Sequence, residues 1–383
     1  MLFRLWEAAP PTGSPPDPYW SGGHLVVAGH AQVRQVLADP ETYRPDNALD
    51  AVTPIPVAAL RILARHGFRL PPTLANNGTD SHPRLRGIVA DALHPDQVGA
   101  QRPWLTGLVR RRVRALAGRL RAGEPVDLYA DLAADLPLLV LARLIALPAD
   151  DVAVVKEFSR AALELFWAPL DEPRQRHLAE VVGGYHARLR RFTATAPGAV
   201  ARLRDEAGPD AVVAALFFLL VAGQETTSQF LTLLLHRLTV EQPVLTALLA
   251  GDVSTPDLVE EGLRLEPPIV SWRRVATVDT TLGGQRVPAG TSVLLWLAAA
   301  GVDPAVVPGG DAHALRPGRP GSRRHLAFGA GAHRCVGAQL SRMEAAVVVD
   351  EAAPLLRGVR VLRAPYSPQN LSFRMPDALV VTR

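Results

Sequence analysis

The stretch HLAFGAGAHRCVG, residues 325 to 337, contains Cys335, the only cysteine among the 383 residues. Its three glycines allow the backbone to approach another group closely. The following AQLSRMEAAVVV predicts a helix from about residue 335 to 356. A thiol where a helix begins faces backbone N–H groups that lower its pKa, so the pattern favours a thiolate that can bind a metal. The alternative for an isolated cysteine is a small buried hydrophobic side chain.

Residues 209 to 240 predict the most apolar helix of the chain, running through the core. Polar side chains interrupt it at AGQETT, residues 222 to 227. Burying the carboxylate of Glu225 and the hydroxyl of Thr226 costs free energy unless these groups are satisfied or used. They therefore indicate a functional pair, or alternatively a helix kink in which Thr226 bonds back to a carbonyl.

The remaining pattern predicts a mainly α fold with a small β region, as one domain spanning residues 1 to 383 without internal repeats or a linker. A strand and a helix beginning near His30 come first, and the chain is mainly helical from about residue 82 to 250. A further helix ends near Leu265, and short strands follow at about 275 to 297. Amphipathic helices are predicted at 98 to 122, 127 to 146, 150 to 168 and 172 to 192.

The composition, with 48% hydrophobic and 20% charged residues, is that of a globular protein. A net charge of +4 could indicate nucleic-acid binding, but the arginines are scattered and lack interleaved aromatic residues or zinc fingers. A mildly basic face for an acidic protein partner fits better. One cysteine excludes internal disulfides, cysteine-rich zinc sites and four-cysteine iron–sulfur clusters. We expect the cluster Arg110, Arg111, Arg112 and Arg114 to be a solvated helix face.

The apolar segments predict a cytoplasmic protein that does not enter a membrane. The apolar run within the N-terminal stretch is too short for a signal peptide. The strongest apolar run of the chain, Ala211 to Ala222, is too short to span a bilayer. Asn77, Gly78 and Thr79 form a glycosylation sequon, which without a secretory signal predicts only a turn.

The cysteine stretch resembles the haem-binding loop of the cytochrome P450 family, HLAFGxGxHxCxGxxLAR, with Ser341 in place of the family's alanine. The resemblance implies that Cys335 is the axial ligand of the iron of haem b. It also implies that Phe328 packs beside this cysteine and that His333 reaches a haem propionate. In this family the thiolate pushes electron density onto the iron and favours O–O cleavage. The resemblance places the haem between the long core helix and the helix that follows the cysteine.

Two further stretches resemble family motifs. AGQETT is similar to AGxE/DTT, which implies that Thr226 orients oxygen and water above the haem and that Glu225 supplies protons. Glu261 and Arg264 match the family's buried ExxR pair, which Arg319 would join. An ordinary surface ion pair is the alternative for residues three apart on a helix.

The resemblance also implies a cage for the two haem propionates. His82 and Arg86 match an HxxxR helix near the haem, and Arg274 matches an arginine on a core strand. Together with His333 they would offer charge-assisted hydrogen bonds to two carboxylates. One segment departs from the family: AGVDPAVV, residues 300 to 307, stands where ANRDPxxF is usual.

The function implied is that of a monooxygenase that hydroxylates or epoxidises a largely apolar small molecule in bacterial secondary metabolism. Electrons would come from NAD(P)H through a separate ferredoxin and ferredoxin reductase, which would dock near Arg334 and Arg342. Oxidative coupling without oxygen insertion, and a catalytically silent haem-binding protein, remain alternatives. The family's substrate-recognition surfaces correspond to Ala48 to Leu74, Phe158 to Phe192, Leu219, and Ile269 to Val270.

Overall fold

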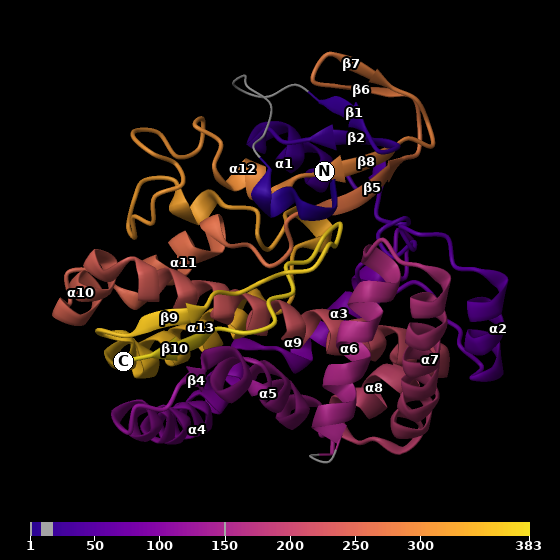
Figure 1. The fold of residues 1–383 in the computed structure, drawn as a ribbon. Coiled ribbons are helices and arrows are strands. Elements are labelled where there is room, and N and C mark those ends of the chain that lie inside the picture. Colours follow the sequence, from indigo (N-terminus) through magenta and orange to yellow (C-terminus); the bar gives the residue numbers. More distant parts are fainter. Residues whose placement is uncertain (1, 9–17, 149–150) are drawn as a thin grey trace.

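The computed structural model describes residues 2–8, 18–148 and 151–383, and within these ranges the fold is mainly helical (Figure 1). Residue 150, the first of the helix predicted at 150 to 168, lies outside the described residues. The helices are α1 His30–Ala38, α2 Val57–Arg65, α3 His82–Ala92, α4 Pro95–Arg121, α5 Leu136–Ile145, α6 Val152–Trp167, α7 Glu172–Thr195, α8 Gly198–Ala207, α9 Pro209–Val240, α10 Gln242–Ala250, α11 Thr255–Leu265, α12 Leu297–Gly301 and α13 Ala338–Ala352.

The described strands form three small sheets at the margins of the helical body. The largest has the order β1-β2-β8-β5-β3, with β2 and β8 parallel and the other neighbours antiparallel. A second sheet has the order β4-β10-β9, and β6 pairs with β7. The strands are β1 Tyr19–Ser21, β2 His24–Val27, β3 Tyr43–Arg44, β4 Val126–Asp127, β5 Trp272–Ala276, β6 Thr280–Leu282, β7 Gln285–Val287, β8 Ser292–Leu295, β9 Arg360–Arg363 and β10 Val380–Thr382.

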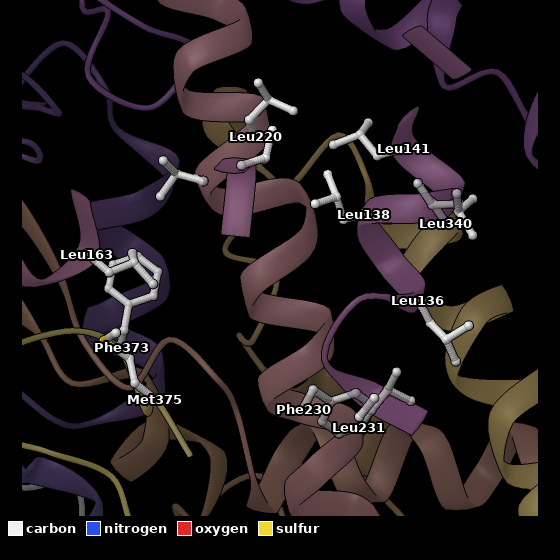
Figure 2. Packing of buried hydrophobic residues seen from close by; sticks show 14 of the residues in the cluster. Leu136, Leu138, Leu141, Leu163, Leu220, Phe230, Leu231, Leu340, Phe373 and Met375 are labelled. Carbon is white, nitrogen blue, oxygen red and sulfur yellow. The ribbon is translucent and has the colours of Figure 1, made fainter. Parts of the chain in front are cut away.

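Helix α9 forms the centre of the core, as the sequence predicts. Its apolar side chains pack between α5 and α13, and Figure 2 shows Leu220 and Phe230 of α9 among leucines that include Leu138 and Leu340. Each such side chain stabilises the fold by about 1.5–3 kcal/mol through burial. By length and composition alone α9 could cross a membrane, but 67% of its most apolar window is buried, as is typical of a core helix.

Tertiary contacts correct two of the predicted helices. The helix predicted at 127 to 146 is interrupted, because Val126 pairs with Val381 in a sheet and the Asp127 carboxylate accepts hydrogen bonds from the N–H groups of Tyr129 and Leu379. A π-helical turn and α5 follow. The helix predicted at 335 to 356 begins only at Ala338 as α13 and ends in a 3₁₀ turn.

Two surface predictions have different outcomes. The Asn77 side chain accepts a hydrogen bond from the Thr79 N–H at 2.9 Å, which confirms the turn. The arginine cluster of α4 is only partly a solvated face. Arg110 donates to Glu351 on α13, and Arg112 donates to Asp135 at the beginning of α5, so these two cations hold α4 against its neighbours.

Gly321 has a structural role in the loop that leads to the cysteine stretch. Its φ is +87°, and a Cβ at this position would lie 1.9 Å from the carbonyl oxygen of Val306. A left-handed conformation alone costs an alanine about 1–2 kcal/mol. We expect Gly321→Ala to cost this amount and a further 2 kcal/mol or more, roughly, because backbone must move.

The matched control is Gly318→Ala. Gly318 has a φ of +80°, but a Cβ added there would meet no atom within 4 Å, so only the conformational cost applies. Urea unfolding of both variants measures the difference, and equal losses would show that the contact with Val306 is unimportant.

Candidate active site

A cavity of about 1390 Å³, including its open mouth, lies between α9 and the cysteine stretch. Residues from α9, α13, β5 and the loop before α13 line it, so segments far apart in the sequence meet here. Its lining is mostly apolar, which makes it suited to a large planar or hydrophobic group. The lining residues that the sequence singles out are Arg86, Leu219, Thr226, Ile269, Arg274, Phe328, His333 and Cys335.

Cys335 lies in the loop before α13, and its side chain is exposed to this cavity. Its N–H donates to the Phe328 carbonyl at 2.8 Å, which fixes the turn around the thiol. The expected lowering of the thiol pKa is wrong for the protein by itself. Burial raises the pKa, while the Gly337 N–H and nearby arginines oppose this effect. A metal ion at the sulfur would reverse the balance, because a coordinating thiol is deprotonated.

Two arginines bring uncompensated positive charge to the cavity. Arg274 on β5 is only 2% exposed, and burial lowers its pKa to about 10. Its guanidinium donates to the neighbouring Arg273 carbonyl. Arg86 on α3 lines the same cavity. No carboxylate is among the described residues that line the cavity, so the site favours an anionic ligand.

His333 lines the cavity, and His82 does not but lies beside it, with ring centroids 4.0 Å apart and the ring planes tilted by 31°. Burial, followed by the charge of Arg86, lowers the pKa of His82, and its Nε2 has no hydrogen-bond partner among the described residues. Burial, then His82 and Arg274, lowers the pKa of His333 to about 4. Two neutral imidazoles beside two cations can donate hydrogen bonds to carboxylates, so the donor set fits the propionates of a haem.

Thr226 on α9 lines the same cavity as Cys335. Its hydroxyl donates to the Ala222 carbonyl at 2.6 Å, which is the back-bonded arrangement that the sequence leaves open as an alternative. Helix α9 nevertheless continues through this position to Val240. The hydroxyl oxygen therefore keeps acceptor capacity toward a group inside the cavity.

Glu225 is fully buried but is not among the residues that line the cavity. Its carboxylate pairs closely with the ammonium of Lys156 on α6, and Arg160 Nη1 lies 3.8 Å from the other oxygen. Lys156 is the only lysine in the chain, and its Nζ also donates to Gln224 at 2.9 Å. Burial lowers the pKa of Lys156, and Glu225 opposes that effect. This ion pair connects the centre of α9 to partly exposed residues on α6.

The predicted ExxR residues lie together in the core. Arg264 donates two hydrogen bonds to Glu261, at 2.8 and 2.7 Å, and both side chains are fully buried. Arg264 also donates to the carbonyls of Gly301 and Ala312. Arg319 Nη1 lies 3.7 Å from Glu261, so the structure brings all three predicted residues together. The alternative of a surface ion pair is wrong.

A second charged cluster lies behind Phe328. Arg342 donates to both oxygens of Glu260, and its guanidinium carbon lies 4.5 Å from the centroid of the Phe328 ring. His325 Nε2 lies 3.2 Å from Glu260. Burial raises the pKa of Glu260, but the hydrogen bonds from His325 and Arg342 outweigh it and bring the pKa to about 2. Arg342 is therefore held in an ion pair rather than being a free surface cation, whereas Arg334 is exposed.

The predicted substrate-recognition surfaces are only partly correct. Leu74, Leu219 and Ile269 line the cavity, but no residue between 158 and 192 does. Phe158 stacks on Tyr185 inside the core, because the apolar side chains of α6 and α7 pack against each other and against α9. Trp272 and Leu297 line the cavity outside the predicted surfaces.

Comparison with known proteins identifies the family. A family model for cytochrome P450 matches residues 255–352. Cytochrome P450-SU2 of Streptomyces griseolus is 32% identical over 364 residues, which cover 93% of this chain and 85% of that protein. The chain belongs to the cytochrome P450 family. The cyclomarin C epoxidase CymV of Salinispora arenicola (strain CNS-205) is 32% identical over 283 residues, covering 70% of this chain and 69% of the epoxidase.

A solved structure supports the same assignment. Cytochrome P450 CREJ in complex with (4-ethylphenyl) dihydrogen phosphate superposes with a TM-score of 0.89 at 27% identity, covering 96% of this chain and 94% of that one. The predicted fold is confirmed. This cytochrome P450 is a monooxygenase that depends on haem iron, receives electrons from redox partners and acts on small molecules.

Sequence reasoning misses several residues of the site. Lys156 stands out in the sequence only as the single lysine, and no motif marks the buried carboxylates Glu260 and Glu344. An isolated acidic residue within a helical pattern gives no signal of burial. The spacing of Glu344 from Ser341, three residues along one helix, is the available hint of a polar strip facing the core.

The buried Glu261–Arg264 pair allows a direct test of its structural weight. Glu261→Gln leaves the charge of Arg264 buried without its partner, so we expect a loss of roughly 3–5 kcal/mol in the free energy of unfolding. Urea unfolding measures this loss. Arg286→Ala is the control, because it removes an exposed pair with Asp279 and should change stability little. Comparable losses of stability in the two variants would contradict the structural role of the Glu261–Arg264 pair.

Proposed function

We propose that this cytochrome P450 binds haem b through Cys335 and inserts one oxygen atom into a C–H or C=C bond of a largely apolar small molecule. The observation that carries this proposal is that Cys335 and Thr226, from segments far apart in the sequence, line one cavity together with Arg86 and Arg274. Haem iron, when bound, supplies the dioxygen chemistry. Arg86, Arg274 and His333, which line the cavity, and His82 beside His333 would hold the two propionates.

Within this proposal Thr226 positions oxygen and water through its hydroxyl, and Glu225 carries protons. Glu225 takes protons from the side of Lys156 and Arg160, since these partly exposed residues face its carboxylate. The apolar residues Leu74, Leu219 and Trp272 exclude water and favour a hydrophobic substrate.

The cellular setting follows from the same proposal. We place the protein in the bacterial cytoplasm. We assign it to a tailoring step of secondary metabolism, because one relative is named as an epoxidase of cyclomarin C. Electrons arrive from NAD(P)H through a separate ferredoxin and ferredoxin reductase. Arg334, next to Cys335, is exposed and also lines the cavity, and its charge suits an acidic electron donor.

The first test is the absorbance spectrum of the reduced protein exposed to carbon monoxide. We expect the thiolate-type Soret band in the wild type and its loss in Cys335→Ala and Cys335→His. Ser341→Ala, which introduces the family's residue in the first turns of α13 just after the cysteine loop, is the control and should keep the band. A band unaffected by loss of Cys335 would refute the proposal. Turnover with labelled dioxygen then separates insertion from oxidative coupling, since only insertion leaves label in the product.

A second test concerns Thr226 and Glu225. Thr226→Ala should lower the fraction of NAD(P)H consumption that yields product, and Glu225→Gln should slow turnover by on the order of 100-fold, as loss of a general acid does. Thr232→Ala is the matched control, because the Thr232 hydroxyl is likewise bonded back to a carbonyl in α9, but Thr232 is fully buried and does not line the cavity. Equal effects of Thr226→Ala and Thr232→Ala would indicate a purely structural role.

A further inference from the structure

A second, smaller cavity lies beside the one that contains Cys335. Its volume is about 310 Å³ with its open end included, against about 1390 Å³ for the first cavity. Helices α3, α5, α8 and α9, which pack against one another, provide its walls. The described residues that line it are all alanine, valine, leucine or isoleucine. The second cavity is therefore apolar throughout its described lining.

Two leucines separate the two cavities. Leu93, directly after α3, and Leu219 on α9 line both of them. A Cβ added at Gly223 would lie 3.2 Å from Leu219 Cδ1 and 3.5 Å from Leu141 Cδ2, so the Leu219 side chain lies over Gly223 and next to α5. Gly223 and Leu141 line the first cavity. The Leu219 side chain is thus part of the boundary between the two spaces.

The second cavity also approaches the surface of the protein. Ala92, Leu144 and Ala199, which line it, are each partly exposed. Leu203 and Leu216, which line it as well, are buried. The lining therefore runs from partly exposed residues of α3, α5 and α8 inward to the two leucines at the first cavity.

The polarity of the second cavity decides what it can hold. A buried water needs about two to four polar partners, whereas a cavity with aliphatic walls stays dry and takes up small apolar molecules. Dioxygen has no hydrogen bonds to lose, and apolar surroundings favour it over water. The substrate of the proposed function suits the larger cavity, and a substrate that fills that cavity also occupies its mouth. Dioxygen then needs a separate entrance.

We propose that the second cavity is a binding site for dioxygen and its entrance to the first cavity, with Leu93 and Leu219 as the gate. The inference rests on the proposed function for the use of dioxygen, but not for the uptake of an apolar gas. No bond forms or breaks at this site, because aliphatic walls hold a molecule by dispersion alone. A change of rotamer at the half-buried Leu219 opens the gate.

Xenon is the probe for the site itself, because it is apolar and scatters X-rays strongly. In crystals of the haem-loaded protein under xenon pressure, we expect an atom in the second cavity, next to Leu203 and Leu216. Ala199→Phe should remove it, because the larger side chain fills the open end. Ala201→Phe is the matched control, since Ala201 is also partly exposed on α8 but does not line the cavity. A wild-type second cavity without xenon would overturn the proposal.

Carbon monoxide, a diatomic molecule close to dioxygen in size, is the probe for entry. Flash photolysis of the reduced carbon monoxide complex gives the bimolecular rate at which the gas returns from solvent. Ala199→Phe should lower this rate several-fold, and Val200→Ala, which widens the cavity, should raise it. Ala201→Phe should leave the rate unchanged. Equal rates in Ala199→Phe and Ala201→Phe would show that the gas does not enter here.

The outcomes separate this inference from the proposed function. Absence of the thiolate-type carbon monoxide band in the wild type refutes the proposed function, whereas xenon still tests the cavity, because its described lining contains none of the residues assigned to the haem. A protein that has this band, but whose rate does not respond to Ala199→Phe, overturns the entrance alone. If Ala199→Phe does not fold, the rate in Val200→Ala decides, and an unchanged rate there overturns the entrance.

Discussion

The buried pair of Glu261 and Arg264 is the interaction on which the site depends. Two buried charges are tolerated only when each is neutralised and its hydrogen-bonding groups are satisfied. Arg264 meets this condition by donating to Glu261 and to the carbonyls of Gly301 and Ala312, while Glu261 also accepts from the Arg316 N–H. The pair thereby joins α11 to the irregular chain that leads into the cysteine stretch, and so it helps to set where the thiol lies.

Charge in the cavity is organised in the opposite way. Arg86 and Arg274 bring positive charge to a site that provides no carboxylate among the described residues, and burial penalises the charged form of Arg274. Such an arrangement lowers the stability of the protein when no ligand is bound. It is expected where a ligand supplies the missing anions. The raised pKa of the Cys335 thiol follows the same logic, because burial disfavours a thiolate until a cation binds it.

Much of the fold and of the site could be predicted from the sequence. The predictions that failed depended on contacts between residues far apart in the sequence. The long apolar run at 209 to 240 predicts α9. The alternation of apolar and polar residues near 275 to 297 predicts the strands β5 to β8. The break within 127 to 146 depends on pairing with Val381, far away in sequence, which no local pattern contains. Phe158 to Phe192 resembles a substrate surface, but apolar residues that pack on a neighbouring helix and those that line a cavity have the same periodicity.

Glu225 and Glu344 illustrate two ways of burying an acid in the core. The Glu225 carboxylate lies against the ammonium of Lys156, the only lysine of the chain, which belongs to α6. Glu344 has no such partner among the described residues, and burial raises the pKa of its carboxyl group well above the ordinary value. A nearby opposite charge favours the ionised form of an acid, whereas burial without a partner favours the neutral form. The surroundings of each carboxyl group therefore decide its chemistry more than its residue type does.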